Sequence, residues 1–401
     1  MKGDMMKRIL ACCFALVLMY PVGIDFYLIG VKQIEASLYA SPSEVHYAFA
    51  IYLMGMASTM IFAGALSDKV GRKPFAIIGS LIFIGACITA GSSVSIDEFL
   101  ASRFFQGIGA GFCYVMCFSI IRDALPEDKR VKVLTVINGV TCSIPVLAPV
   151  IGSVILIWFS WESLFFIMAF LGLLPLILVS FFLKETRIRI QNNASQHHLN
   201  KSAENLLEFN FVSRLIISSL GVMSILTYVN VSPMILMTGL SFTINEYAIA
   251  MGLLSLMSMF TSFITPVLLK TYQQSHLIFT TQILYLFGAM ITSLASMFDA
   301  RILLTLLGMS CVCIGFALSF GILMSQAVHS FKHKAGLANS ILAVSQIIVS
   351  SLFITLGAWL ALTPENILIY ALLFTATIST ILLTYQHKTR QKGYRSYEQT
   401  A

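Results

Sequence analysis

The stretch GALSDKVGRKP, residues Gly64–Pro74, places four charged side chains in a short connection between two long apolar runs. Its charged residues are Asp68, Lys69, Arg72 and Lys73. Basic residues in such a connection are typical of a loop that stays on the cytoplasmic side of a membrane. This preference for basic residues does not explain Asp68 or the glycines Gly64 and Gly71. The stretch therefore predicts a function beyond membrane topology.

The composition is that of a chain that lies largely inside a lipid bilayer. Hydrophobic residues make up 58% and charged residues 11% of the 401 residues, whereas a soluble domain carries about 25% charged residues. A helix needs about 20 apolar residues to cross the bilayer. Runs of that length predict an all-α integral membrane protein with twelve transmembrane helices. We place them at about Ile9–Val31, Val45–Leu66, Pro74–Ser92, Phe99–Ile121, Val133–Trp158, Ser163–Leu183, Leu215–Gly239, Tyr247–Leu269, Leu277–Met297, Ile302–Val328, Leu337–Leu360 and Asn366–Tyr385.

The basic residues indicate how the chain crosses the membrane. With the N-terminus in the cytoplasm, the even-numbered connections also lie there, and 22 of the 25 Lys and Arg residues fall on that side. Cytoplasmic connections carry such an excess, so both termini are predicted to be cytoplasmic. Lys32 and Arg301 fall on the other side, and Arg103 lies within a span. Topology and attraction to anionic lipid account for the net charge of +7, which implies no nucleic-acid partner.

The longest polar stretch, residues 184–210, divides the predicted spans into six and six. We therefore predict an N-terminal six-helix bundle at 1–183, a cytoplasmic linker at 184–210, a C-terminal six-helix bundle at 211–386 and a cytoplasmic tail at 387–401. Two such halves are typical of transporters whose substrate binds between them. The eight cysteines lie in apolar runs without the spacing of a zinc site, and no phosphate-binding loop occurs. Neither a metal nor a cofactor is expected.

Two charged side chains, Asp25 and Arg103, lie clearly inside predicted spans. A charge inside the bilayer costs at least about 2.5 kcal/mol on insertion scales, so it is rare without a function. Their distances from the span ends place both about 7–10 Å below the outer boundary. They could form an ion pair that only fixes helix packing, or line one aqueous cavity as a proton carrier and its partner. Gln106 lies on the helical face of Arg103, and Asn138 is a further polar residue in the fifth span.

Proline and glycine predict bends in two spans. Pro21 precedes the acid of the first span, and the fifth span carries Pro145, Pro149 and Gly152. Two prolines four residues apart predict a bent helix, because each removes a backbone hydrogen bond and clashes with the preceding turn. Such a bend would either serve a rocking movement or only shape the helix.

Three stretches together resemble the major facilitator superfamily and, within it, the twelve-span drug:proton antiporters. GALSDKVGRKP is similar to the superfamily signature between the second and third spans, and RFFQGIGAG, which begins at Arg103, to its fourth-span motif. YPVGIDFYLIGVKQIEASL, centred on Asp25, resembles the first-span motif of the drug-exporting branch. The fifth span departs from the antiporter pattern, because Ile144 precedes Pro145 where a glycine is usual. A second acid that some relatives have in the first span is missing, which leaves Asp25 as the one expected proton carrier.

The resemblance implies that the first of these stretches helps to close the cytoplasmic side of a transporter. Asp68 would pair with Arg72 on its own loop or with Arg122 at the cytoplasmic end of the fourth span. It could also face the N-terminus of the eleventh span near Gly336, where the helix dipole favours an anion. A plain topogenic loop would need only lysines and arginines. The residues expected in this gate are Gly64, Asp68, Gly71, Arg72, Lys73 and Arg122.

The resemblance also implies a function. We expect a proton-coupled exporter of small amphiphilic drugs, chloramphenicol-like neutral compounds among them, that works by alternating access in a bacterial inner membrane. Asp25 would exchange a proton for the drug, and Arg103 would hold the deprotonated carboxylate. The partners would be the drug, protons and the lipid bilayer, and the chain would be a monomer.

The alternative on the same fold is a sugar or metabolite exporter, which differs in the lining of the cavity. Two other classes fit the sequence less well. A membrane-embedded enzyme would need paired catalytic groups, and His46, near the start of the second span, has no evident partner. A sensor would normally carry a soluble output domain. We therefore expect a transporter and not an enzyme.

Overall fold

The computed structural model is helical throughout the residues that it describes. These are residues 2–125, 150–186, 208–295, 301–329 and 335–398, with single positions between 133 and 148. Within these ranges no strand occurs. The helices before residue 200 are α1 (Lys2–Ile29), α2 (Val31–Ser37), α3 (Pro42–Val70), α4 (Arg72–Gly91), α5 (Ile96–Ala124) and α7 (Glu162–Phe182). Those after it are α8 (Phe209–Pro233), the π-helical turn η1 (Met234–Gly239), α9 (Ile244–Thr271), α10 (Gln274–Leu294), α11 (Arg301–His329), α12 (Ala335–Trp359) and α13 (Pro364–Glu398).

Among the described helices, eleven stretches are long and apolar enough to cross a membrane. Each overlaps one of the spans predicted from the sequence. The predicted fifth span, Val133–Trp158, is described continuously only from Val150 onward, with single described positions before it. The prediction of an all-α integral membrane protein is confirmed.

Hydrogen-bonded caps fix where several spans begin. At the start of α3, the Ser41 side chain accepts from the backbone N–H of Glu44 at 3.4 Å, and the Glu44 carboxylate accepts from the backbone N–H of Ser41 at 2.7 Å. Thr243 and Glu246 form the same pair of bonds at the start of α9. Such a pair satisfies backbone N–H groups that the first helical turn leaves free. A Ser or Thr followed three residues later by Glu therefore marks these helix starts.

The chain divides into two compact units. Unit 1 consists of Met1–Leu199, Pro233–Leu253 and Ile354–Ala361. Unit 2 consists of Asn200–Ser232, Leu254–Phe353 and Leu362–Ala401. The end of α8 and the turn η1 thus belong to unit 1, whereas the body of α8 belongs to unit 2. The two six-helix bundles at 1–183 and 211–386 stay a prediction.

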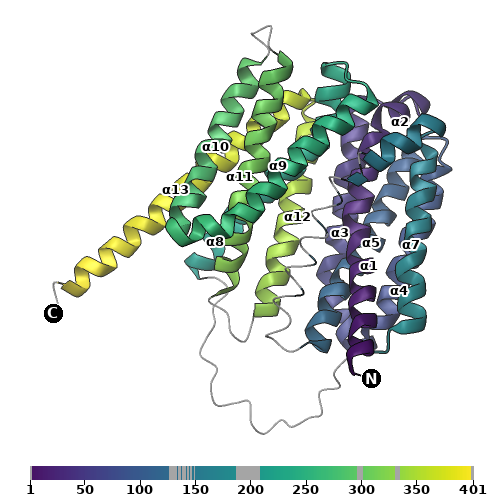
Figure 1. The fold of residues 1–401 in the computed structure, drawn as a ribbon, viewed down its shortest axis with the longest axis horizontal. Coiled ribbons are helices and arrows are strands. Elements are labelled where there is room, and N and C mark those ends of the chain that lie inside the picture. The colour runs from purple at the N-terminus through teal and green to yellow at the C-terminus, as the bar shows by residue number, and fades with distance from the viewer. Residues whose placement is uncertain are drawn as a thin grey trace. The chain divides into compact units, whose positions relative to one another are not determined.

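In unit 1, α5 is the central helix (Figure 1). It packs against α1, α3 and α4, and α7 packs against α1 and α4. Gly107 explains how closely α3 and α5 approach each other. A Cβ atom at this position would lie closer than 3.0 Å to the backbone of Tyr52, a distance that real Cβ atoms do not show. Small residues at a helix crossing allow this kind of contact inside a membrane.

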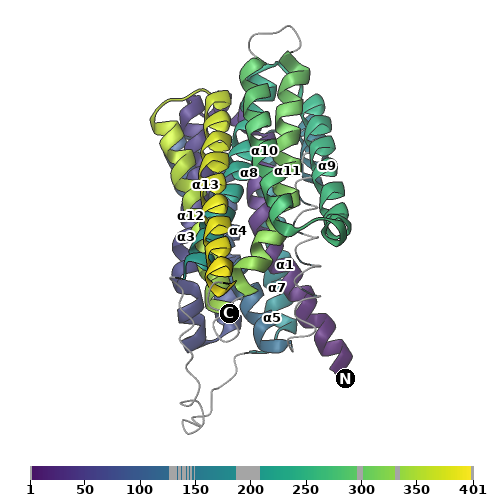
Figure 2. The same cartoon turned by 90° about the vertical axis from the view of Figure 1, so that its left-hand side faces the viewer.

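In unit 2, α10 and α11 lie side by side (Figure 2), and α10 also packs against α13. Their buried apolar contacts include Ile278 on α10 with Leu318 and Ile322 on α11. Leu220 on the part of α8 in this unit packs against Ala371 on α13. The unit is thus a helical bundle with an apolar core of its own.

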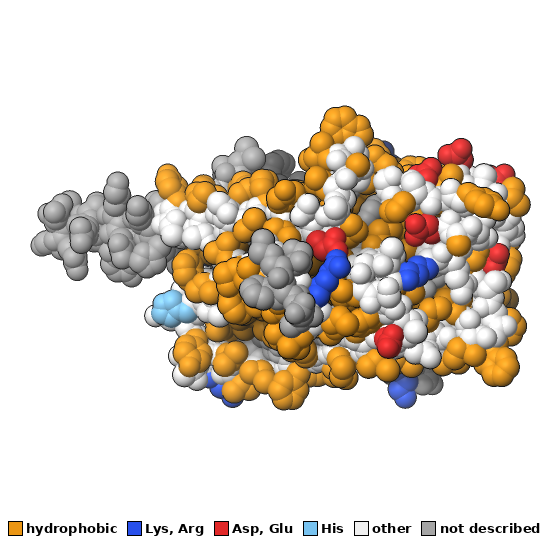
Figure 3. All heavy atoms as spheres, turned by 90° about the horizontal axis from the view of Figure 1, so that it is seen from above, with side chains coloured by type: hydrophobic (Ala, Val, Ile, Leu, Met, Phe, Trp, Pro, Cys, Tyr) orange, Lys and Arg blue, Asp and Glu red, His pale blue; other side chains and the backbone are white. Residues whose placement is uncertain are grey.

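Large apolar side chains cover much of the outer surface. On α7, Phe166, Phe170 and Phe181 are 45%, 72% and 79% exposed. Seen from above, hydrophobic side chains cover much of the described surface and charged ones are few (Figure 3). An exposed apolar surface of this extent is typical of helices that face lipid.

The α3–α5 contact makes a direct prediction. Gly107→Ala should lower the stability of the purified protein by about 1–3 kcal/mol, because the added methyl group has no space between the two helices. Gly85→Ala is the matched control, because no atom lies within 4 Å of the position of its Cβ. Thermal unfolding in detergent measures both variants. Equal midpoints for the two variants would contradict the close helix contact.

Candidate functional site

Arg103 on α5 is fully buried within unit 1. Its Nη1 donates to the backbone carbonyl of Gly23 on α1 at 2.9 Å and also to Oε1 of Gln106. The guanidinium carbon lies 4.5 Å from the centre of the Tyr27 ring and 4.6 Å from that of the Tyr52 ring. A desolvated cation–π contact is worth about 2 kcal/mol or more. Two aromatic faces and a carbonyl, rather than a carboxylate, therefore stabilise the charge.

Both tyrosines are held in place by hydrogen bonds between helices α1 and α3. The Tyr27 hydroxyl, on α1, donates to the carbonyl of Val45 on α3 at 2.7 Å. The Tyr52 hydroxyl, on α3, donates to the carbonyl of Tyr20 on α1 at 3.0 Å. Aromatic side chains with their hydroxyls bonded in this way keep a fixed orientation. The two rings consequently form a rigid surround for Arg103.

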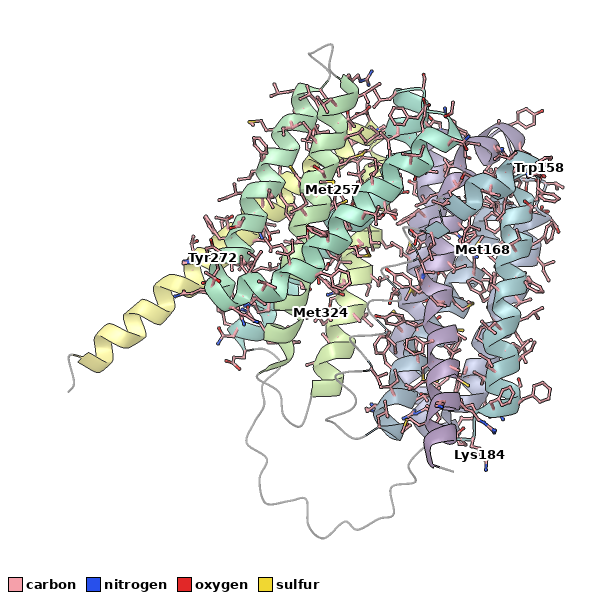
Figure 4. All side chains as sticks on the ribbon, in the orientation of Figure 1. Trp158, Met168, Lys184, Met257, Tyr272 and Met324 are labelled. Carbon is pink, nitrogen blue, oxygen red and sulfur yellow. The ribbon has the colours of Figure 1, made fainter. Side chains whose placement is uncertain are left out.

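Gln106 joins the site to α4 and α7. Its amide nitrogen lies 3.0 Å from Sγ of Cys87 and 3.6 Å from Sδ of Met168. Met168 lies between Trp158 and Lys184, which mark opposite ends of unit 1 (Figure 4). The structure thus brings the predicted residues Arg103 and Gln106 together, at a depth between the two ends of the unit.

Part of the Arg103 guanidinium has no partner among the described residues. Its Nε and Nη2 are buried and form no hydrogen bond there. These two nitrogens lie on one edge of the guanidinium, the edge that binds a carboxylate or another planar acceptor through two parallel bonds. Most buried polar groups in proteins are hydrogen-bonded, so these two unused donors keep Arg103 a candidate functional residue.

Asp25 lies on α1 and is also buried, with 7% of its surface exposed. Both side chains are described, yet no hydrogen bond or ion pair joins its carboxylate to Arg103. Helix geometry explains this. Asp25 is two residues from both Gly23 and Tyr27, so it points about 200° around α1 from each of them. Because Arg103 contacts Gly23 and Tyr27, the Asp25 carboxylate faces another side of α1.

At the Lys184 end of unit 1, Gly71 joins α3 to α4. Its φ of 128° and ψ of 166° lie in a region that only glycine adopts readily. The Glu185 carboxylate, shortly after α7, accepts from the backbone N–H of Arg72 at 2.8 Å and of Lys73 at 3.2 Å. Lys73 Nζ donates to the carbonyl of Ser180 on α7 at 2.8 Å. Because the start of a helix carries free N–H groups and partial positive charge, Glu185 caps α4.

The Arg72 side chain ties the same turn to the end of α5. It is buried, and its Nε donates to Oδ2 of Asp123 at 2.8 Å. Its Nη1 donates to Oγ of Ser67 on α3 at 2.6 Å. Arg122, whose side chain is 47% exposed, lies with its Nε 3.3 Å from the other oxygen of Asp123. The charged residues of the turn therefore bind α3, α4 and α5 together.

Several other predicted site residues lie outside the described part of the structure. They are the side chain of Asp68 and the residues Asn138, Pro145 and Pro149. Their predicted roles stay predictions.

The remaining predicted residues are described. Pro21 lies inside α1, which continues as one helix to Ile29. A Cβ atom on Gly152 would collide with Ile29, so this glycine lies directly against α1. Gly64 has open space around the position of its Cβ. No group of three metal-binding side chains occurs among the described residues.

At the Trp158 end, Lys32 on α2 contacts the end of η1. Its Nζ donates to the carbonyl of Met237. The carbonyl of Ile235 in the same turn accepts a hydrogen bond from the backbone N–H of Leu240 at 3.0 Å. A cation near the last carbonyls of a helix is stabilising. Partial burial raises the pKa of the neighbouring Glu35, and the positive charge of Lys32 partly opposes this.

A model of the Major Facilitator Superfamily matches residues 13–354. The chain belongs to this superfamily. Membership makes it a multi-pass membrane transporter rather than an enzyme, as the sequence motifs predicted.

Curated relatives are similar over almost the whole chain. The multidrug resistance protein MdtL of Klebsiella pneumoniae (strain 342) is 44% identical over 380 residues, which cover 94% of this chain and 95% of that protein. The MdtL protein of Shewanella sp. (strain ANA-3) is 45% identical over 378 residues, with the same coverage. The predicted resemblance to the drug-exporting branch of the superfamily is confirmed.

Solved structures of the superfamily share the fold. A D-xylose-proton symporter aligns with a TM-score of 0.77 at 15% identity and covers 95% of this chain and 97% of that chain. The nucleoside transporter NupG aligns with a TM-score of 0.68 at 12% identity and covers 95% of this chain and 98% of that chain. At this level of identity the likeness concerns the fold alone.

Sequence reasoning missed four residues of the transporter that these sites use. Tyr27 and Tyr52 lie in apolar runs, where an aromatic residue is most often part of the core. Asp123 follows Arg122 at the end of the fourth span, and Glu185 is among the first polar residues after the sixth. The position of Asp123 and Glu185 beside span ends could have indicated contacts with the basic turn. Nothing in the sequence distinguished the two tyrosines from core residues.

The turn between α3 and α4 generates a prediction with a control in the same motif. Gly71→Ala should destabilise the transporter by about 1–3 kcal/mol, because its backbone conformation strains any other residue. The added Cβ would also lie 2.5 Å from Oε2 of Glu185. Gly64→Ala should be neutral or stabilising, since alanine favours helix more than glycine by about 1 kcal/mol. Thermal midpoints in detergent compare them, and an unaffected Gly71→Ala would refute the role of this turn.

Proposed function

We propose that this transporter is a proton-coupled exporter of small amphiphilic drugs that works by alternating access. It would lie in a bacterial inner membrane as a monomer, with both termini in the cytoplasm. Six-helix bundles at 1–183 and 211–386, joined by the linker 184–210, would move relative to each other. The substrates would include neutral, chloramphenicol-like compounds.

The relatives support the substrate class. The proteins from Klebsiella and Shewanella named above are called multidrug resistance proteins, and the match to each extends over 94% of this chain. We infer drug export from the names of these relatives, and the mechanism from the residues of this chain.

The observation that carries the mechanism is the buried carboxyl group of Asp25. It lies within a membrane span with only 7% of its surface exposed, and Arg103 is bonded elsewhere. A carboxylate without a paired cation is costly in such surroundings, so binding a proton is favourable there. Release of that proton would leave a negative charge that a bound drug or a rearranged donor must compensate. Exchange of proton and drug at one carboxyl group is what an antiporter requires.

The cytoplasmic gate forms the second part of the proposal. Arg72 and Glu185 already hold the turn between α3 and α4 against α5 and the end of α7. Asp68 would complete the gate by a contact that forms only while the cytoplasmic side is closed. Arg72, Lys73 and Arg122 would supply the positive charge for this contact.

The driving force depends on the charge of the drug. Exchange of one proton for a neutral drug moves net charge, so the membrane potential contributes about 2.3 kcal/mol per 100 mV. Exchange for a monovalent cation is electroneutral, and only the pH gradient then drives export.

Asp25→Asn tests this mechanism. The amide keeps the shape of the side chain but does not titrate. We expect loss of drug accumulation driven by a pH gradient in proteoliposomes, while downhill exchange of a neutral drug survives in part. Asp97→Asn, an exposed acid in the first turn of α5, is the matched control and should transport normally. Gradient-driven accumulation by Asp25→Asn would show that the proton travels by another group.

A further inference from the structure

Tyr52 links Arg103 to the helix carrying Asp25, in addition to the direct bond from Arg103 to the Gly23 carbonyl of that helix. It belongs to α3, its ring lies against the Arg103 guanidinium of α5 at 4.6 Å, and its hydroxyl donates to the Tyr20 carbonyl of α1 at 3.0 Å. A second α1 carbonyl, that of Met19, lies 3.4 Å from the same hydroxyl. One buried side chain on α3 thus contacts two further helices, α1 and α5.

Gly23 makes this arrangement possible on the side of α1. A Cβ atom at this position would lie 2.7 Å from the Tyr52 hydroxyl oxygen and 2.9 Å from its ring. The same Gly23 offers its carbonyl to Arg103. Any larger residue would push the Tyr52 ring away from α1. Gly23, two residues before Asp25, thus leaves space for the Tyr52 ring and also binds Arg103 through its carbonyl.

The Arg103 position depends on these contacts, because no ion pair holds it among the described residues. Of its groups, only Nη1 is hydrogen-bonded there. The Tyr27 ring also stabilises the positive charge of Arg103 through a cation–π contact. Tyr27 itself belongs to α1, and its hydroxyl bonds to the carbonyl of Val45 on α3. Among the described residues, Tyr52 lies outside α1, bonds to a carbonyl of α1 and contacts Arg103 at the same time.

We propose that Tyr52 is a positioning residue that transmits movement of α1 to Arg103. This inference rests on the proposed function, because it concerns the coupling of proton and drug. The Tyr20 carbonyl is five residues before Asp25, about 7.5 Å along the helix. A change in α1 on proton or drug binding at Asp25 would shift that carbonyl, and the hydroxyl bond would carry the shift to the ring. The guanidinium would then turn its unused Nε and Nη2 toward a new acceptor.

Tyr52→Phe separates transmission from packing. Phenylalanine retains the ring beside Arg103 and loses only the bond to α1. We expect gradient-driven drug accumulation to fall by about three- to tenfold relative to downhill exchange, the factor that loss of one buried hydrogen bond produces. Drug binding in detergent should stay close to wild type, and the thermal midpoint should fall by no more than the loss of one hydrogen bond explains. Tyr52→Leu, which also removes the aromatic face, should lower the ratio by about tenfold or more.

Tyr114→Phe is the matched control. Tyr114 lies on α5 within unit 1, and its ring is 5.7 Å from that of Tyr20. It makes no cation–π contact with Arg103 among the described residues. The ratio of driven accumulation to downhill exchange should be unchanged in this variant. A pH profile of accumulation should be flattened by Tyr52→Phe and preserved by Tyr114→Phe.

The outcomes separate this inference from the proposed function. A wild-type protein that accumulates drug under a pH gradient, with Tyr52→Phe equal to it, overturns the inference and leaves the proposed function standing. A parallel loss of binding, exchange and accumulation in Tyr52→Phe assigns the residue a packing role and overturns it too. A wild-type protein without gradient-driven accumulation overturns both. An equal defect in Tyr114→Phe shows that the effect is not specific to Tyr52 and counts against the inference.

Discussion

Burial of the Arg103 guanidinium is the constraint on which the arrangement of α1, α3 and α5 depends. A charged group away from water is tolerated only when nearby groups replace the lost hydration. Two tyrosine rings and the Gly23 carbonyl do so here. To reach one guanidinium, α1 and α3 must both lie close to α5, and the glycines at the crossings permit that approach. The close packing of α1, α3 and α5 and the burial of the Arg103 charge therefore depend on each other.

The three basic residues that the cytoplasmic bias leaves unexplained all have specific partners. Arg103 lies between aromatic rings, Lys32 contacts the carbonyl end of η1, and Arg301 lies 3.4 Å from Glu365 at the start of α13. Topology alone disfavours basic residues at the last two positions. Their contacts between helices give a physical reason for keeping them.

The sequence was sufficient for the eleven membrane spans found among the described residues, because long apolar runs are a strong signal. It also identified Arg103 and Gln106 as residues of one helical face, which the structure brings together. It did not predict that Arg103 would bond to Gly23 rather than to Asp25. Span depth gives only the position along a helix, whereas the contact depends on which face of α1 meets α5. That face is decided by glycines and aromatic residues, whose role in an apolar run emerges only from packing.

The central claim is that the Asp25 carboxyl group exchanges a proton for the drug. The most direct measurement is proton release when the detergent-solubilised transporter binds a neutral drug in a weakly buffered solution. The account predicts that drug binding releases a proton from the wild-type protein and none from the Asp25→Asn variant. Equal proton release from both proteins, or binding to the wild-type protein without any release, would contradict it.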